Sequence, residues 1–129
     1  MARKDVQPKT LSDPRPRYTQ AIQTKGGKLL FIAGQTASDK DGNVVGKGDI
    51  EAQTRQVFDN LRAVLKAAGG TLDNLVMTTT YITGREYREG YNRVRGSQYK
   101  KTPPTSTLVI VSGLANPDYL IEIAGIAVI

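Results

Sequence analysis

The chain has 129 residues, a length typical of one domain, and 39% of them are hydrophobic, as in an ordinary globular protein. It contains no histidine and no cysteine, which excludes Ser-His-Asp triads, thiol nucleophiles, disulfides and metal sites built on those ligands. The net charge of +6 suits a nucleic-acid binder, a protein with an anionic substrate, or simply a solvated surface. No secretory signal or membrane-spanning run is evident, so we expect a soluble cytoplasmic protein.

The N-terminal region divides into a polar arm and two strand-like stretches. Residues 1–17 are rich in charge and proline and are interpreted as an arm ahead of a single domain over 18–129. The stretches at about 18–24 and 28–33 are separated by Gly26 and Gly27 (with Lys25 before them). Because a Gly-Gly pair supplies the positive φ of a tight turn, the pattern predicts that the two stretches pair as a hairpin.

The clearest helix signal covers 50–68, where apolar residues recur at spacings of three, four and seven. Asp49 can cap its start, and Gly69-Gly70 can end it in a left-handed conformation. The opposite face is charged, so we expect a surface helix with one buried stripe. The stripe consists of Ile50, Val57, Phe58, Leu61, Val64, Leu65 and Ala68.

The second half of the chain alternates strands with one further helix. The β-branched run at 75–83 predicts a strand, and a helix is expected over about 85–99, ending before Pro103-Pro104. Two final strands are predicted at 105–111 and 119–129. The resulting order, ββαβαββ, indicates an α+β domain with two helices packed on one face of a sheet. The predicted inner face of the second helix carries Tyr87, Tyr91, Val94 and Gln98 or Tyr99.

The last strand is apolar on both faces, although the two predicted helices can cover only one face of the sheet. A second copy of the chain is the simplest cover for the other face, so the pattern predicts a homo-oligomer. One face carries Leu120, Glu122, Ala124, Ile126 and Val128, and the other carries Ile121, Ile123, Gly125, Ala127 and Ile129.

Glu122 is the only charged residue between Tyr119 and the C-terminus, and it stands within this apolar strand. Burying an unpaired carboxylate costs several kcal/mol, so such a group is paired, protonated or functional. It could act as a base on water near neutral pH, or it could form a structural ion pair with an arginine. The residue pattern leaves both interpretations open.

Other motifs give weaker signals. Asp41-Gly42-Asn43 indicates a turn and not a calcium loop, because the rest of the twelve-residue pattern and its final glutamate are absent. No glycine-rich phosphate motif occurs. The basic segment 85–101 contains three tyrosines and could bind RNA by charge and stacking, but an amphipathic helix with solvated charges explains it more simply.

The order of elements and several local motifs resemble the RidA/YjgF family, the reactive-intermediate deaminases, also described as L-PSP endoribonucleases. The resemblance runs from about Tyr18 to Val128, most of the chain. Its carriers are Tyr18, Ala33-Gly34-Gln35, RQVFDNLRAVLKAAGG at 55–70, VMTTTYIT at 76–83, Tyr91-Asn92, Pro103-Pro104-Thr105-Ser106 and IEIAGIAV at 121–128.

This resemblance implies a chorismate-mutase-like (RidA-like) fold and a homotrimer. Three sheets would form a central barrel with the helices outside, and small-molecule clefts would lie between neighbouring subunits. Deaminating members add water to the imine of a 2-imino acid and release ammonia, without any cofactor or metal. Carried over by position, Glu122 is the catalytic carboxylate. The substrate-binding positions are Tyr18, Gly34, Asn92, Thr105, Ser106 and Thr107.

Thr105 departs from the family pattern, in which an arginine clamps the substrate carboxylate. A hydroxyl cannot replace that charged, two-pronged contact, so we expect an altered substrate unless Arg15 or Arg17 compensates. Three functions remain open. They are an imine/enamine hydrolase using Glu122, a non-catalytic trimeric protein that binds a small ligand or regulates, and an RNA-acting protein. Without histidine the usual acid–base pair of a ribonuclease is missing, which makes nucleic acid the least favoured partner.

Overall fold

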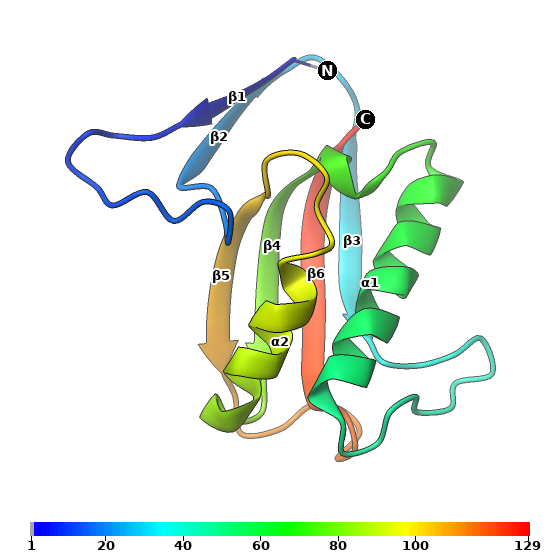
Figure 1. Cartoon of the computed structure of the whole chain (residues 1–129). Helices are drawn as coiled ribbons and strands as arrows, with labels where there is room; N and C mark the ends of the chain where they lie inside the picture. Colours follow the sequence, from blue (N-terminus) through cyan, green and yellow to red (C-terminus); the bar gives the residue numbers. More distant parts are fainter. Residues whose placement is uncertain (1) are drawn as a thin grey trace.

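A computed structural model describes residues 2–129 of the chain. Its centre is a four-stranded sheet with two helices against one face, so the predicted α+β class is confirmed (Figure 1). The strand order is β3-β6-β4-β5, in which β4 and β5 are parallel and the other neighbours antiparallel. The strands are β3 (Leu29–Thr36), β4 (Leu75–Ile82), β5 (Thr105–Ile110) and β6 (Ile121–Val128).

Helix α1 (Ile50–Ala67) agrees with the sequence prediction at both ends. The side chain of Asp49 accepts a hydrogen bond from the Ala52 amide at 3.1 Å, and Gly69 ends the helix with a φ of 85°. Of the predicted stripe, Val57, Phe58, Leu61 and Leu65 are fully buried, whereas Ala68 is exposed. A short 3₁₀ turn, η1 (Leu72–Asn74), leads into β4.

The second helix is shorter than the predicted span of 85–99. A 3₁₀ turn, η2 (Arg85–Tyr87), precedes α2 (Arg88–Arg95), and the helix ends at Gly96. Glycine has low helix propensity, and the chain must turn here to reach the prolines before β5. Within residues 2–129, no helix is both long enough and apolar enough to cross a membrane.

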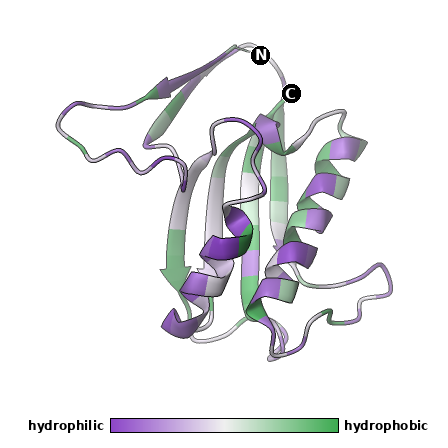
Figure 2. Cartoon of the chain, viewed as in Figure 1, coloured by the Kyte–Doolittle hydropathy of each residue, from purple (hydrophilic) through white to green (hydrophobic). Residues whose placement is uncertain are grey.

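The hydrophobic core lies between the helices and the face of the sheet that they cover (Figure 2). The two faces of β6 separate as predicted, because Ile121 and Ile123 are buried beneath the helices, while Glu122 and Ile126 are half-buried on the opposite face. The core residues are Ile32, Ala37, Val57, Phe58, Leu61, Leu65, Leu72, Leu75, Ile82, Tyr91, Ile121, Ile123 and Ala127.

The predicted N-terminal hairpin is wrong. β2 (Ala21–Lys25) pairs antiparallel with β1 (Ala2–Val6), inside the segment expected to be irregular, and not with β3. Gly26 and Gly27 have φ values of 74° and 84°, but they turn the chain from this two-stranded ribbon into β3 instead of reversing it. The ribbon projects beside the sheet in Figure 1.

Arg3 explains why the ribbon is held beside the sheet. Its guanidinium donates hydrogen bonds to the carbonyls of Leu75 and Asp73, at 3.3 and 3.4 Å, and to those of Pro103 and Thr102, at 2.7 and 3.1 Å. One side chain in β1 therefore joins the starts of β4 and β5. A long-range contact of this kind leaves no periodic signal in the sequence.

Candidate functional site

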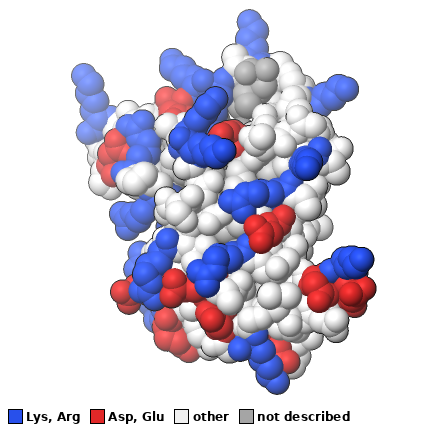
Figure 3. Space-filling model, turned by 45° about the vertical axis from the view of Figure 1, so that its right-hand side comes forward, with Lys and Arg blue, Asp and Glu red and all other residues white. Residues whose placement is uncertain are grey.

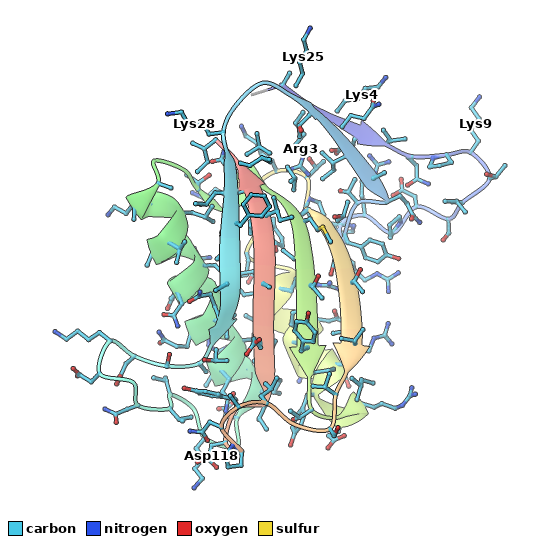
Figure 4. All side chains as sticks on the ribbon, turned by 180° about the vertical axis from the view of Figure 1, so that it is seen from behind. Arg3, Lys4, Lys9, Lys25, Lys28 and Asp118 are labelled. Carbon is cyan, nitrogen blue, oxygen red and sulfur yellow. The ribbon has the colours of Figure 1, made fainter. Side chains whose placement is uncertain are left out.

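The face of the sheet opposite the helices, which we call the open face, is apolar and uncovered in the single chain (Figure 4). Phe31 is 72% exposed, Leu29 63% and Met77 45%, values far above those of core side chains. A shallow hollow of about 240 Å³ lies among Phe31, Met77 and Ile126. Exposed apolar area of this kind marks a surface that binds a partner or a ligand.

Glu122 lies on the open face, across from Thr36 of β3 and Tyr81 of β4. The pairing of β3 with β6 shifts between Ile32 and Gln35, and this irregularity brings the backbone of Gly34 against the Glu122 carboxylate. Within residues 2–129, the carboxylate has no cation within 4.0 Å and no hydrogen-bonding side chain. The structural ion pair with an arginine is therefore not observed in the described chain.

A second group of candidate residues lies at the other edge of the sheet, on the side that faces the helices. Thr19, 2% exposed, fixes the chain beside β5, because its amide donates to the Pro104 carbonyl at 3.0 Å and its hydroxyl to that of Pro103 at 2.5 Å. Tyr18 and Ser106 consequently line the same pocket, of about 180 Å³. We call it the β5-edge pocket; its lining residues are Arg17, Tyr18, Arg88, Arg95, Ser106 and Leu108.

Arg95 is the functional candidate that the sequence prediction missed. It is 7% exposed, and its guanidinium donates to Asn92 Oδ1 at 2.6 Å, to the Tyr91 hydroxyl at 3.2 Å and to Ser106 Oγ at 3.4 Å. The guanidinium carbon also lies 4.7 Å from the centre of the Tyr91 ring. The signal was the spacing: Arg95 follows Tyr91 by four residues, which places it on the same helix face.

The electrostatic balance at Arg95 is incomplete in the described chain. Among residues 2–129 no carboxylate lies within 4.0 Å of its guanidinium. A cation–π contact contributes about 1–2 kcal/mol and a hydrogen bond from a charged donor about 1.5–3 kcal/mol, but neutral partners do not balance the charge, and burying an unpaired charge costs several kcal/mol. A buried arginine without a counter-charge is therefore a candidate anion-binding group.

Thr105 and Thr107 are on the open face of β5, and their positions separate them from Glu122. The Thr105 hydroxyl donates to the Val76 carbonyl at 3.0 Å, so it is used within the sheet. Thr105 stands opposite Met77, which stands opposite Ile126, four residues along β6 from Glu122. At about 3.3 Å per residue and 4.8 Å per strand, the two are about 16 Å apart, so a small ligand cannot touch both in one chain.

Five of the seven predicted site residues thus form two groups, and the other two lie apart from both. Gly34 and Glu122 adjoin one another on the open face, whereas Tyr18, Asn92 and Ser106 gather around Arg95 at the β5 edge. Thr105 and Thr107 lie on the same edge strand as Ser106 but point to the opposite face.

Arg15 and Arg17, the two arginines that could compensate for the absence of an arginine at position 105, have different surroundings. Arg15 binds Asp13 through its Nε and Nη2, at 2.8 and 2.5 Å, and this hydrogen bonding lowers the pKa of Asp13 to about 2. Arg15 is therefore already paired. Arg17, by contrast, lines the β5-edge pocket.

The remaining charges are mixed in sign. Figure 3 shows Lys and Arg side chains interspersed with Asp and Glu over one face of the molecule. In the basic segment, Arg93 pairs with Glu89 at 3.2 Å and with Glu51 at 3.3 Å. In the part of the chain that the structure describes, no cluster of three or more His, Cys, Asp or Glu residues could hold a metal ion.

Comparison with known proteins identifies the class to which this fold and site belong. Residues 9–129 match the family model described as Endoribonuclease L-PSP. A RutC family protein of Pyrococcus horikoshii is 42% identical over 121 residues, covering 92% of this chain and 93% of the relative. A RutC family protein of Sulfurisphaera tokodaii is 40% identical over 113 residues, 86% and 88% of the two chains.

Solved structures agree with this class. A Rid-family protein of unknown function from Yersinia pestis, YyfB, has a TM-score of 0.93 at 33% identity and covers all of both chains. RidA from an Antarctic Psychrobacter has a TM-score of 0.74 at 27% identity, covering 98% of this chain and 99% of the other. The chain therefore belongs to the Rid/YjgF (L-PSP) family, and the predicted resemblance is confirmed.

Proposed function

We propose that this protein is a cofactor-free imine/enamine hydrolase that releases ammonia. Water adds to the carbon of the C=N bond and gives a carbinolamine, which expels ammonia and leaves a carbonyl group. One water is consumed and one ammonia is formed, with no oxidant, reductant or metal. An enamine enters the same path after its tautomerisation to the imine.

The observation that carries this proposal is the unpaired Glu122 carboxylate against the Gly34 backbone. A carboxylate without an internal partner can accept a proton from water as that water attacks the imine carbon. The Gly34 backbone brings polar groups next to it without a side chain in the way, which suits a small substrate. Removing a positioned base of this kind slows a reaction by about 10²–10⁴-fold.

The separation of the candidate residues supports a site made by two subunits. β5 is an edge strand, so residues on both of its faces can approach a neighbouring molecule across the edge. The exposed apolar face, on which Phe31 is the most exposed of the large apolar side chains, is a surface that a homotrimer would cover. In this arrangement the Glu122 group of one chain and the β5-edge group of the next would line one cleft.

The test is ammonia release from imines generated in the assay by an amino-acid oxidase, compared between the wild-type protein and Glu122→Gln. We expect the rate of ammonia release by the variant to be at least 100-fold lower than that of the wild-type protein, close to the uncatalysed rate. Glu86→Gln makes the same chemical change at an exposed carboxylate and should leave the rate unchanged. No acceleration of any imine, with or without a carboxylate, would overturn the proposal.

Thr105 favours a second candidate, a non-catalytic protein that binds a small ligand. A hydroxyl that is bonded to the Val76 carbonyl cannot clamp a substrate as an arginine fork does. Saturable binding of a small molecule without turnover, equal in wild-type protein and Glu122→Gln, would favour this candidate. Strongly salt-dependent RNA binding would instead favour the activity named in the family model.

A further inference from the structure

The β5-edge pocket contains a positive charge that the described protein does not neutralise. Arg95 is 93% buried, and all three of its side-chain partners, on Asn92, Tyr91 and Ser106, are uncharged. Those partners orient the guanidinium but do not balance its charge. The arrangement is a fixed, positioned cation at the wall of a cavity.

The rest of the pocket reinforces this charge. Two further arginines, Arg17 and Arg88, line it, and no aspartate or glutamate is among its lining residues. A larger hollow of about 550 Å³ shares both arginines and contains one acidic residue, Glu89, which pairs with Arg93 at 3.2 Å. The approach to Arg95 is therefore positive, which concentrates small anions there.

The size and lining of the pocket select the anion. Its volume of about 180 Å³ accommodates a molecule of only a few heavy atoms. The guanidinium of Arg95 and the hydroxyls of Tyr18 and Ser106 can bond to oxyanion oxygens, and Leu108 supplies an apolar wall for a short carbon chain. A planar guanidinium matches a planar carboxylate in two parallel hydrogen bonds.

We infer that the β5-edge pocket binds a small carboxylate, with Arg95 as its principal ligand. The site is on the helix side of β5, whereas Thr105 is on the open face. Arg95 would therefore supply, from the opposite face of the same strand, the positive charge that Thr105 lacks. If the proposed imine hydrolysis is correct, on which this step rests, the ligand is the carboxylate end of a 2-imino acid or of its 2-oxo acid product. Carboxylate binding itself does not depend on turnover.

The test is an NMR titration that follows the Arg95 Nε–H resonance in the intact protein. Pyruvate should shift this resonance saturably, whereas the neutral analogue pyruvamide should not shift it. Arg95→Lys keeps the charge but loses the fork, and we expect it to weaken pyruvate binding at least 10-fold. Arg55→Lys, at an exposed position of α1, should bind as the wild-type protein does.

A second variant covers the case in which Arg95→Lys is unstable. Leu108→Phe fills the pocket without touching the charge, and it should also weaken pyruvate binding at least 10-fold. An unmoved Arg95 resonance, or equal binding of pyruvate and pyruvamide, would overturn the proposal. Tighter binding of inorganic phosphate than of pyruvate would also overturn the assignment to carboxylates.

Kinetics separate this proposal from the proposed function. Arg95→Lys should raise KM for imines that carry a carboxylate, with kcat changed less, and leave neutral imines unaffected. Pyruvate binding without hydrolysis of any imine would refute the hydrolase and leave the carboxylate site intact. Hydrolysis that Arg95→Lys leaves unchanged, together with an unmoved resonance, would refute the site and leave the hydrolase intact.

Discussion

The carboxylate of Glu122 occupies the space that a side chain at position 34 would need. A Cβ built on Gly34 overlaps with Oε2 of Glu122 and lies 2.7 Å from its carboxyl carbon. The backbone of Gly34 does not have a positive φ, so the reason for glycine here is this close approach and not its conformational freedom. A single methyl group at position 34 would displace the proposed catalytic group.

Gly34→Ala should therefore damage activity more than it damages the fold. We expect imine hydrolysis to fall at least 10-fold as the carboxylate moves, with a loss of about 1–3 kcal/mol in the free energy of unfolding. Ammonia release and urea denaturation measure the two effects. Gly113→Ala is the matched control, because a Cβ there meets nothing within 4 Å. Full activity in Gly34→Ala would contradict the placement of Glu122.

A buried glutamine ties α1 to two loops. The side-chain amide of Gln53 donates to the carbonyls of Asp118 and Gly46, at 2.8 and 3.2 Å, and its oxygen accepts from the Leu120 amide at 2.9 Å. Gln53 is fully buried, so these three backbone groups have little access to water. Gln53 thereby holds the loop before α1 to the loop before β6, the strand that carries Glu122.

Gln53→Leu leaves those backbone groups without partners and should cost about 2–4 kcal/mol in the free energy of unfolding. Urea denaturation at a fixed protein concentration measures the loss, because an oligomer's stability depends on concentration. Arg55→Leu, at an exposed position of the same helix, should change stability by about 0.5 kcal/mol or less. Equal midpoints for the two variants would show that the Gln53 bonds contribute nothing.

Local patterns in the sequence predicted the parts of the fold that depend on burial. The boundaries of α1, the strand at 75–83 and the two-faced character of β6 all follow from the spacing of apolar residues. Glu122 was conspicuous for the same reason, as one charge in an apolar strand. These features depend only on residues that lie a few positions apart in the sequence.

Pairings between distant residues could not be predicted in the same way. β2 has the composition of a hairpin partner for β3, yet it pairs with β1 because Arg3 holds the ribbon against carbonyls about 70 and 100 residues away. Arg95 was one of several basic residues in its segment, and its burial against Tyr91, Asn92 and Ser106 distinguishes it. A charged residue in the sequence usually indicates a solvent-exposed position, and this rule fails for a charged residue that the fold buries.

Asp13 should titrate well below other aspartates. The guanidinium of Arg15 lowers its pKa from 3.8 to about 2, so any stabilisation from the pair is complete above pH 4 and is lost as the pH falls through 2. A carboxyl-carbon NMR titration should show a midpoint near 2 for Asp13. Arg15→Gln should return the midpoint toward 3.8, and Lys9→Gln should leave it unchanged. An ordinary midpoint in the wild-type protein would contradict the pairing.

Phe31 tests whether the open face is a subunit interface. Light scattering should give the wild-type protein three times the 14.0 kDa mass of the chain. Phe31→Asp should release monomers, because an interface that buries an unpaired carboxylate loses several kcal/mol of association energy. Arg55→Asp, on the outer surface of α1, should remain a trimer. Because Glu122 and the β5-edge pocket lie on opposite faces of the sheet in one chain, the monomers should also lose imine hydrolysis. A wild-type monomer, or a Phe31→Asp trimer with full activity, would show that the site is complete within a single chain or that another surface joins the subunits.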